Sequence, residues 1–335
     1  MMSGDIPVKN SPQEESSGHR RVGVFNLVRH HRALPAFVGA FAVWIATALI
    51  AGHGIGGTLT TGMAIGTFLL IVGIGQMFVI TSGNGGIDLS VPWVMTLSAY
   101  LSAMVMVGRD SNLLLGLAVA ILVGLAAGTL NLALIEVFAM PPIVATLALG
   151  LVLESWCLVL SNGTNVSPSP LLVSFTTGWL GPIPLLAIFG VVLMVIFTIF
   201  LNRSSYGRSL KAVGQSQMAA RLSGVRRLRV TAIAYLTCAV SAAIAGFLLV
   251  GYAGGPSLTL GLTYQLASIA VVVLGGSLIA GGMSNVPGIW AAALLLTLLV
   301  TMVNVTHLGP GMQDILQGAL IVIVLAIGGH RRVRA

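Results

Sequence analysis

Long runs of hydrophobic residues, separated by short polar breaks, extend from residue 33 to residue 329. A membrane-spanning helix needs about 20 mostly apolar residues, and about ten of these runs approach that length. We therefore predict an all-α, polytopic membrane protein with about ten transmembrane helices. The predicted spans are residues 33–52, 62–82, 90–107, 112–138, 142–160, 182–201, 231–252, 263–280, 286–305 and 311–329.

Two of the breaks, 82–91 and 254–262, are expected to be broken or re-entrant segments rather than simple turns. The first contains SGNGGIDLS, in which Gly83, Gly85 and Gly86 argue against a regular helix. A tight turn or close backbone packing is the expected reason for these glycines.

Composition agrees with this pattern, because 56% of the residues are hydrophobic and only 7% are charged, which excludes a soluble globular protein. The net charge of +8 does not indicate nucleic acid binding, since every basic residue except Arg109 lies in one of three clusters. Positive residues stay on the cytoplasmic side, so the clusters predict cytoplasmic N and C termini. The clusters are Lys9, Arg20, Arg21, Arg29 and Arg32; Arg203, Arg208, Lys211, Arg221, Arg226, Arg227 and Arg229; and Arg331, Arg332 and Arg334.

The same pattern divides the chain into three parts. Residues 1–32 are expected to form a partly disordered cytoplasmic tail, and residues 330–335 a basic cytoplasmic tail. Residues 33–329 form the transmembrane domain, with a cytoplasmic loop at 202–230. The first apolar run is longer than the core of a signal peptide and is expected to be retained.

Sequence motifs for catalysis are missing. Neither Lys9 nor Lys211 belongs to a P-loop, the histidines form no H-E-x-x-H pattern, and no serine lies in G-x-S-x-G. Cys157 and Cys238 fall inside predicted helices and are interpreted as buried, inert thiols. We expect no catalytic residue, metal or cofactor in this chain; an intramembrane enzyme is the disfavoured alternative.

Acidic residues near predicted spans need an explanation, because a charge inside a membrane is costly. Asp88 and Ser90 are predicted to cap the helix that follows them, since a helix with Ser90 as its N-cap has Pro92 in its first turn, where proline is tolerated. The alternative is a direct role in a transport path.

Three other carboxylates have simpler interpretations or remain open. Glu136 is expected at the solvated interface, and Asp314 in the first turn of the last span. Glu154 lies deeper, and either pairs in the bundle interior with a polar residue such as Asn131 or lies near the outer end of its helix.

The loop between 202 and 230 is predicted to contain a short amphipathic helix over Gln215–Leu222, with Gly214 and Gly224 as stops. Met218, Ala219 and Leu222 would share one face of this helix. Such a helix could enter a groove on a cytoplasmic partner, whereas a loop that only fixes topology or touches anionic lipid is the alternative.

Several motifs resemble one family, the permease subunits of ABC importers for ribose, xylose and related monosaccharides, which is distantly related to branched-chain amino acid permeases. The similarity covers most of the chain. The motifs are ITSGNGGIDLSVP (80–92), MPPIVATLALG (140–150), NGT (162–164), YGRSLKAVGQSQMAARLSGV (206–225) and LASIAVVVLGGSLIAGGMSNVPGIWAAALL (266–295).

The resemblance implies a multi-pass permease of the bacterial inner (plasma) membrane. Its implied partners are a cytoplasmic ABC ATPase, a periplasmic sugar-binding protein and a second permease subunit, with a homodimer expected, besides membrane lipid. The ATPase would dock on the loop that corresponds to 206–224, where Gly214, Ala220, Arg221 and Gly224 are the predicted coupling residues.

Departures from the family motifs affect specificity more than the fold. They are Pro92, Gln215, Ser216 and the step Met283-Ser284-Asn285. Permeases that transport branched-chain amino acids, nucleosides, polyols or furanosyl signals have similar sequences, so these solutes remain alternatives to a monosaccharide. An ion-coupled secondary carrier and a non-transporting scaffold are alternatives of a different class.

Overall fold

A computed structural model describes residues 34–51, 55–162, 166–305, 311, 312, 315, 318 and 319. The predicted tails 1–32 and 330–335, Asp314 and most of the predicted span 311–329 lie outside the described residues.

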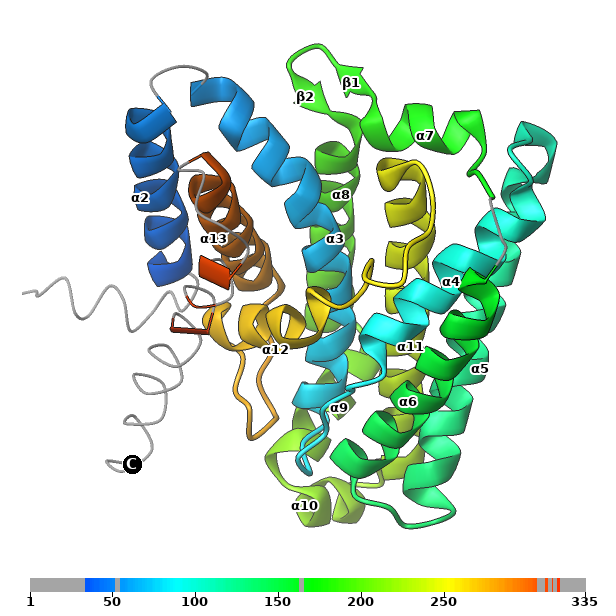
Figure 1. Ribbon diagram of the computed structural model, residues 1–335. Coiled ribbons are helices and arrows are strands. Elements are labelled where there is room, and N and C mark those ends of the chain that lie inside the picture. Colours follow the sequence, from blue (N-terminus) through cyan, green and yellow to red (C-terminus); the bar gives the residue numbers. More distant parts are fainter. Residues whose placement is uncertain are drawn as a thin grey trace, which may run out of the picture. The chain divides into compact units, whose positions relative to one another are not determined.

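Helices make up most of the described structure, which also contains loops and one short antiparallel hairpin (Figure 1). The hairpin places Leu180 opposite Ile183. The helices and strands are α2 (Leu34–Ala51), α3 (Ile55–Thr81), α4 (Val91–Met106), the 3-10 helix η1 (Asp110–Asn112), α5 (Leu113–Glu136), α6 (Pro142–Ser161), α7 (Pro170–Thr177), β1 (Trp179–Leu180), β2 (Ile183–Pro184), α8 (Leu185–Arg203), α9 (Ser205–Gln215), α10 (Gln217–Leu222), α11 (Arg227–Ala253), α12 (Tyr264–Leu274) and α13 (Val286–Val305).

Six stretches of helix are long and apolar enough to cross a bilayer among the described residues, namely α3, α5 with η1, α6, α8, α11 and α13. The apolar helices α2, α4 and α12 are shorter. These features confirm an all-α polytopic membrane protein. Every predicted span except 311–329 corresponds to a helix in the structure.

Helix α11 lies at the centre of the bundle, where it packs against α3, α4 and α5. Small residues allow these backbones to come close, as is typical of helix packing in membranes. A Cβ on Gly75 of α3 would lie 2.9 Å from the Cα of Cys238, and one on Gly124 of α5 would lie 2.7 Å from the Cα of Val240. Both cysteines are buried and free, as expected.

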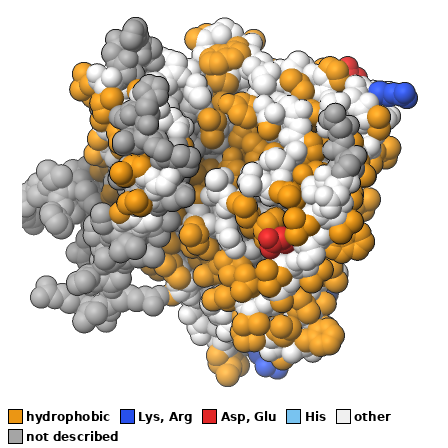
Figure 2. Space-filling view, in the orientation of Figure 1, with side chains coloured by type: hydrophobic (Ala, Val, Ile, Leu, Met, Phe, Trp, Pro, Cys, Tyr) orange, Lys and Arg blue, Asp and Glu red, His pale blue; other side chains and the backbone are white. Residues whose placement is uncertain are grey.

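Burial divides the spanning helices into two groups. The most apolar windows of α3, α11 and α13 are 72–89% buried, whereas those of α5, α6 and α8 are 22–33% buried. In Figure 2, hydrophobic side chains are spread over the whole coloured face among uncharged polar and backbone atoms, and basic side chains lie only at its upper right and lower edges. The outer helices therefore present an apolar surface that suits lipid or another membrane subunit.

Both predicted breaks are irregular. Residues 82–90 contain no helix, and Gly83, Asn84 and Gly85 have φ values of 77°, 57° and 67°. Residues 254–263 form turns after Gly254 ends α11 with φ of 77°. The predicted span 263–280 is too long, because α12 ends at Leu274 and Gly276 has φ of 85°.

Candidate functional site

A buried polar cluster forms where α4 begins inside the bundle. Asp88 is 2% exposed, and its Oδ1 accepts hydrogen bonds from the backbone N–H of Ser90 at 2.9 Å and from the Ser90 hydroxyl at 2.6 Å. The Nδ2 of Asn131, on α5, donates to Ser90 Oγ at 2.9 Å and to both Asp88 carboxylate oxygens at 3.4 Å. These contacts fix the start of α4 against α5.

Ser90 lies at the predicted N-cap position, but the expected capping hydrogen bond from the helix to its side chain is absent. Ser90 occupies the N-cap of α4, with Pro92 in the first turn, but its side chain makes no capping bond to the helix. The hydroxyl instead donates to Asp88. The non-helical segment is therefore held in part by its own carboxylate.

Two further side chains, which were not predicted from the sequence, hold this segment from neighbouring helices. With its amide turned to satisfy both groups, Gln76 of α3 accepts from the Asp88 N–H at 3.1 Å and donates to the Asp88 carbonyl at 3.3 Å. Thr146 of α6 accepts from the N–H of Leu89 at 3.1 Å. In the sequence, Gln76 and Thr146 are both polar residues inside apolar runs, and this feature could have identified them.

Of the two alternatives left open for Glu154, the structure excludes pairing with Asn131. Asn131 is fully buried against Asp88 and Ser90, whereas Glu154 is half-buried on the outer helix α6. Among the described residues, no salt bridge involves Glu154.

Four glycines bring the end of α3, helix α9 and the loop after α12 together. The N–H of Gly282 donates to the Thr81 carbonyl at 2.9 Å, and the Gln215 side chain donates to the Gly282 carbonyl at 3.4 Å. A Cβ on Gly214 would overlap Thr81 O and the backbone of Gly282. We call this the glycine junction, and its members are Gly83, Gly214, Gly281 and Gly282.

The glycine junction joins α9 directly to two interrupted membrane segments. Gly83 and Gly281 have φ values of 77° and 91°, which side chains rarely adopt. A Cβ on Gly281 would lie 2.6 Å from the Cα of Gly83. The backbone of α9 is therefore in direct contact with the segments at 82–90 and 275–285.

The predicted helix Gln215–Leu222 is corrected to two helices. Gly214 lies within α9 rather than before a helix, and Ser216 is both the C-cap of α9 and the N-cap of α10. The Ser216 hydroxyl accepts from the N–H of Ala219 at 3.3 Å. Gly224, with φ of 80°, follows α10 as predicted.

Helix α10 is buried on one side and exposed on the other. Ala220 is 4% exposed and packs within this chain, so it holds α10 against the rest of the bundle. Met218 and Leu222 are 69% and 82% exposed, and Ala219 and Arg221 are exposed as well. The shared face predicted for Met218, Ala219 and Leu222 therefore faces outward.

Aromatic packing holds α9 to the membrane helices. The ring of Tyr206 stacks on Phe78 of α3 and Phe200 of α8, with centroids 6.1 and 6.0 Å away. Burial raises the pKa of the Tyr206 hydroxyl above its usual range, so the hydroxyl stays protonated and donates to the Val230 carbonyl at 3.1 Å.

Glu136, predicted at a solvated interface, forms a salt bridge with Arg227 that joins the end of α5 to the start of α11. The side chains are 15% and 39% exposed. Because water screens such a pair, we expect its coupling energy to be no more than about 1 kcal/mol. A double-mutant cycle with Glu136→Gln and Arg227→Gln measures it, and a coupling above about 3 kcal/mol, typical of a buried pair, would contradict this expectation.

Two of the departures, Pro92 and Asn285, lie where loops meet helices, and only the side chain of Asn285 forms hydrogen bonds there. The carbonyl of Pro92 lies beside Gly261, so the loop after α11 reaches the start of α4. Asn285 Nδ2 donates to the Gly275 carbonyl at 2.8 Å, and its Oδ1 accepts from the Gly288 N–H at 3.3 Å. Asn285 thus closes the loop between α12 and α13.

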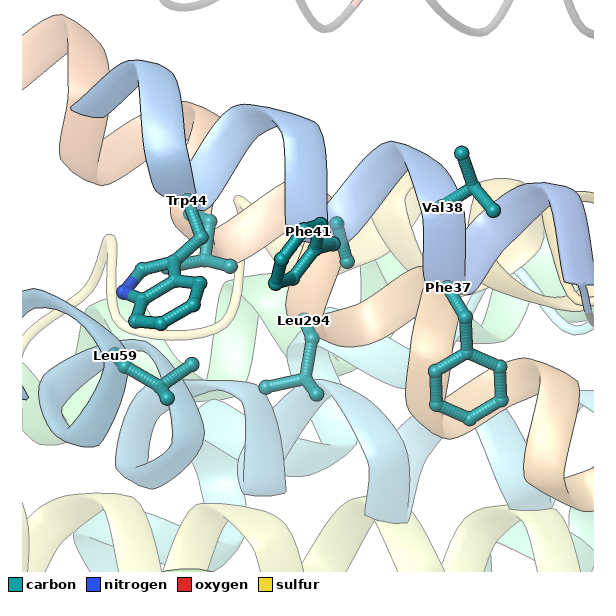
Figure 3. A pocket seen from close by; sticks show the side chains of 8 residues that line it. Phe37, Val38, Phe41, Trp44, Leu59 and Leu294 are labelled. Carbon is teal, nitrogen blue, oxygen red and sulfur yellow. The ribbon is translucent and has the colours of Figure 1, made fainter. Parts of the chain in front are cut away.

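A separate pocket is lined entirely by hydrophobic residues from α2, α3 and α13 (Figure 3). Phe41 and Trp44 point from α2 toward Leu294 and Leu59, and Phe37 points to the same side of α2. A polar solute needs converging hydrogen-bonding groups, so this pocket does not suit one. Within the described ranges, no three His, Cys, Asp or Glu side chains lie together as a metal site.

Comparison with known proteins identifies the class of this arrangement. Residues 58–325 match the family model described as branched-chain amino acid transport system / permease component. A probable ABC transporter permease of Sinorhizobium fredii is 34% identical over 266 residues, which are 78% of each chain. No solved structure matches the chain.

Two similar relatives are ribose import permeases. That of Escherichia coli K12 is 30% identical over 269 residues, covering 78% of this chain and 82% of the relative. That of Bacillus subtilis is 31% identical over 265 residues, covering 77% and 80%. Because the family model spans both interrupted segments and the α9–α10 loop, the chain belongs to the branched-chain amino acid transport system / permease component family.

Proposed function

We propose that this chain is the permease subunit of an ATP-driven ABC importer for a monosaccharide. The observation that carries the proposal is the similarity to ribose import permeases over more than three quarters of the chain. Fructose import permeases of Rhizobium meliloti and Bifidobacterium longum are similar as well, at 30% and 27% identity. The chain would form the path, and a separate subunit would hydrolyse ATP.

The described charges favour a neutral solute over an amino acid, which the family description also allows. A branched-chain amino acid carries an ammonium and a carboxylate, and each needs a partner when it leaves water. The described basic residues are confined to Arg109 and the stretch 203–229. No described basic side chain is thus available beside Asp88 or Glu154 for a carboxylate.

The orientation of the subunit follows from its basic residues. We infer that α9 and α10 face the cytoplasm of a bacterial inner membrane, with ten spans and both termini on that side. The ATPase would dock on α10, and the binding protein would approach from the end with α7 and the hairpin (Figure 1). A second copy of the chain would complete the path.

Co-purification tests the assignment. The full chain, extracted in detergent from its native host, is expected to retain an ATPase with a P-loop and a periplasmic sugar-binding protein, identified by mass spectrometry. Recovery of the chain alone, with solute uptake driven by an imposed ion gradient, would contradict it.

The exposed apolar residues of α10 provide a specific prediction. Replacing Met218 and Leu222 together by serine should lower the ATPase retained per permease about ten-fold, because exposed apolar side chains at a docking helix supply most of the contact. Quantitative mass spectrometry of the purified complex measures the ratio.

A matched control uses another exposed apolar residue. Val137, 76% exposed beyond the C-terminal end of α5, is replaced by serine and should leave ATPase retention unchanged. Equal loss in both variants, or none in either, would argue against α10 as the docking surface.

A further inference from the structure

We propose that Trp93, Glu154 and Gln265 form a sugar-contact site in the translocation path. This inference rests on the function proposed above and specifies where the solute touches the chain. The three side chains come from α4, α6 and α12, and all three are half-buried.

Two residues of α6 that flank Glu154 contact Trp93. A Cβ on Gly150 would lie 3.3 Å from Cδ1 of the Trp93 ring, and the Cys157 thiol contacts the Trp93 carbonyl at 4.0 Å. Gly150 and Cys157 are four residues before and three residues after Glu154, so the three residues lie on one side of α6.

Gln265 reaches the same region from α12. Its Nε2 donates to the Leu89 carbonyl at 3.5 Å, immediately before the N-cap residue of α4. Two short helices thus begin side by side within the bundle, each after a non-helical segment. Paired interruptions of this kind mark solute sites in membrane transporters.

The depth of Glu154 in α6 requires an aqueous or polar surrounding. It lies 12 residues after Pro142, which corresponds to about 18 Å along the helix. Nearby Leu151 and Trp156 are 57% and 60% exposed and apolar. Because a carboxylate at this depth is costly in lipid, its half-exposed side is assigned to a water-filled path.

The chemistry of the three side chains fits a monosaccharide. A carboxylate accepts hydrogen bonds from hydroxyl groups, a carboxamide both donates and accepts, and an indole offers an apolar face to the C–H side of a sugar ring. Asp88 cannot take this role, since it is 2% exposed and already accepts from Ser90 and Asn131.

The first test measures coupling in the complete complex. Proteoliposomes containing the chain and its ATPase, supplied with the binding protein, are assayed with labelled ribose and fructose. Glu154→Gln and Trp93→Ala should lower sugar transported per ATP hydrolysed about ten-fold, while ATP hydrolysis stays within about two-fold of wild type. Glu154→Asp should restore part of the ratio. The control Ser155→Ala, at an exposed position of α6, should match wild type.

The second test asks whether water and sugar reach Glu154. In the complex, Glu154→Cys should react with a water-soluble methanethiosulfonate reagent, and saturating sugar should slow the reaction. The native thiols are buried. If Glu154→Gln and Trp93→Ala transport as much sugar per ATP hydrolysed as wild type, or if Glu154→Cys does not react, this assignment is wrong. The proposed importer function would not be affected by that result. A wild-type complex that transports neither sugar would overturn the proposed function and this site with it.

Discussion

Replacing Gly214 by alanine is expected to lower ATP-driven sugar uptake about ten-fold while the chain still inserts into the membrane. The new Cβ would overlap Thr81 O and the backbone of Gly282, so α9 would have to move away from both interrupted segments. The atoms that the new Cβ would overlap belong to the backbone, which cannot move aside as a flexible side chain does. The contact between α9 and the segments of the translocation path would therefore be weakened. Uptake and ATP hydrolysis in the same proteoliposomes measure the loss of coupling.

Gly57→Ala provides the matched control for this effect. Gly57 lies in α3, and a Cβ at that position would have nothing within 4 Å. The control should therefore keep wild-type uptake. If Gly214→Ala transports and hydrolyses ATP like Gly57→Ala, the glycine junction does not transmit motion.

Replacing Asp88 by leucine is expected to lower the free energy of unfolding by about 3 kcal/mol. Leucine has a similar shape but no acceptor, so the N–H and hydroxyl of Ser90 and the amide of Asn131 lose the partner they share. Unsatisfied buried donors are costly in the bundle interior. Unfolding of the purified chain in mixed detergent micelles measures the difference.

Asp88→Asn separates the loss of an acceptor from the change of shape. Asparagine keeps one carbonyl oxygen, which can accept from the Ser90 N–H, so this variant should lose less than half as much stability as Asp88→Leu. Equal destabilisation by both variants would show that the acceptor oxygen does not hold the segment.

The helical fold follows from the sequence because its signals are local. Apolar runs of spanning length predict helices wherever they occur, and Gly83, Gly85 and Gly86 predict the interruption before α4. The positive φ values at Gly83 and Gly85 are the physical reason for that interruption.

Tertiary contacts explain what the sequence did not reveal. The sequence offers several polar residues as possible partners for Asn131. The packing of α5 against α4 and α11 determines that Asn131 bonds to Asp88 and Ser90 and not to Glu154. Gly214 has the local signature of a helix stop. Its position inside α9 is explained by the close approach of Thr81 and Gly282, which lie far away in sequence.

The short elements between α6 and α8 were not predicted. Helix α7 has eight residues and each strand of the hairpin has two, so no periodic pattern has room to develop. Pro170 and Gly178, which bound α7, were the available signals.

ATP-dependent uptake by the reconstituted complex decides whether this chain is part of a sugar importer. Proteoliposomes containing this chain and its co-purified ATPase, with the binding protein added on the periplasmic side, are given labelled ribose or fructose. We expect sugar accumulation that needs ATP and the binding protein and does not need an ion gradient. Accumulation that follows a proton or sodium gradient in the absence of ATP would contradict it.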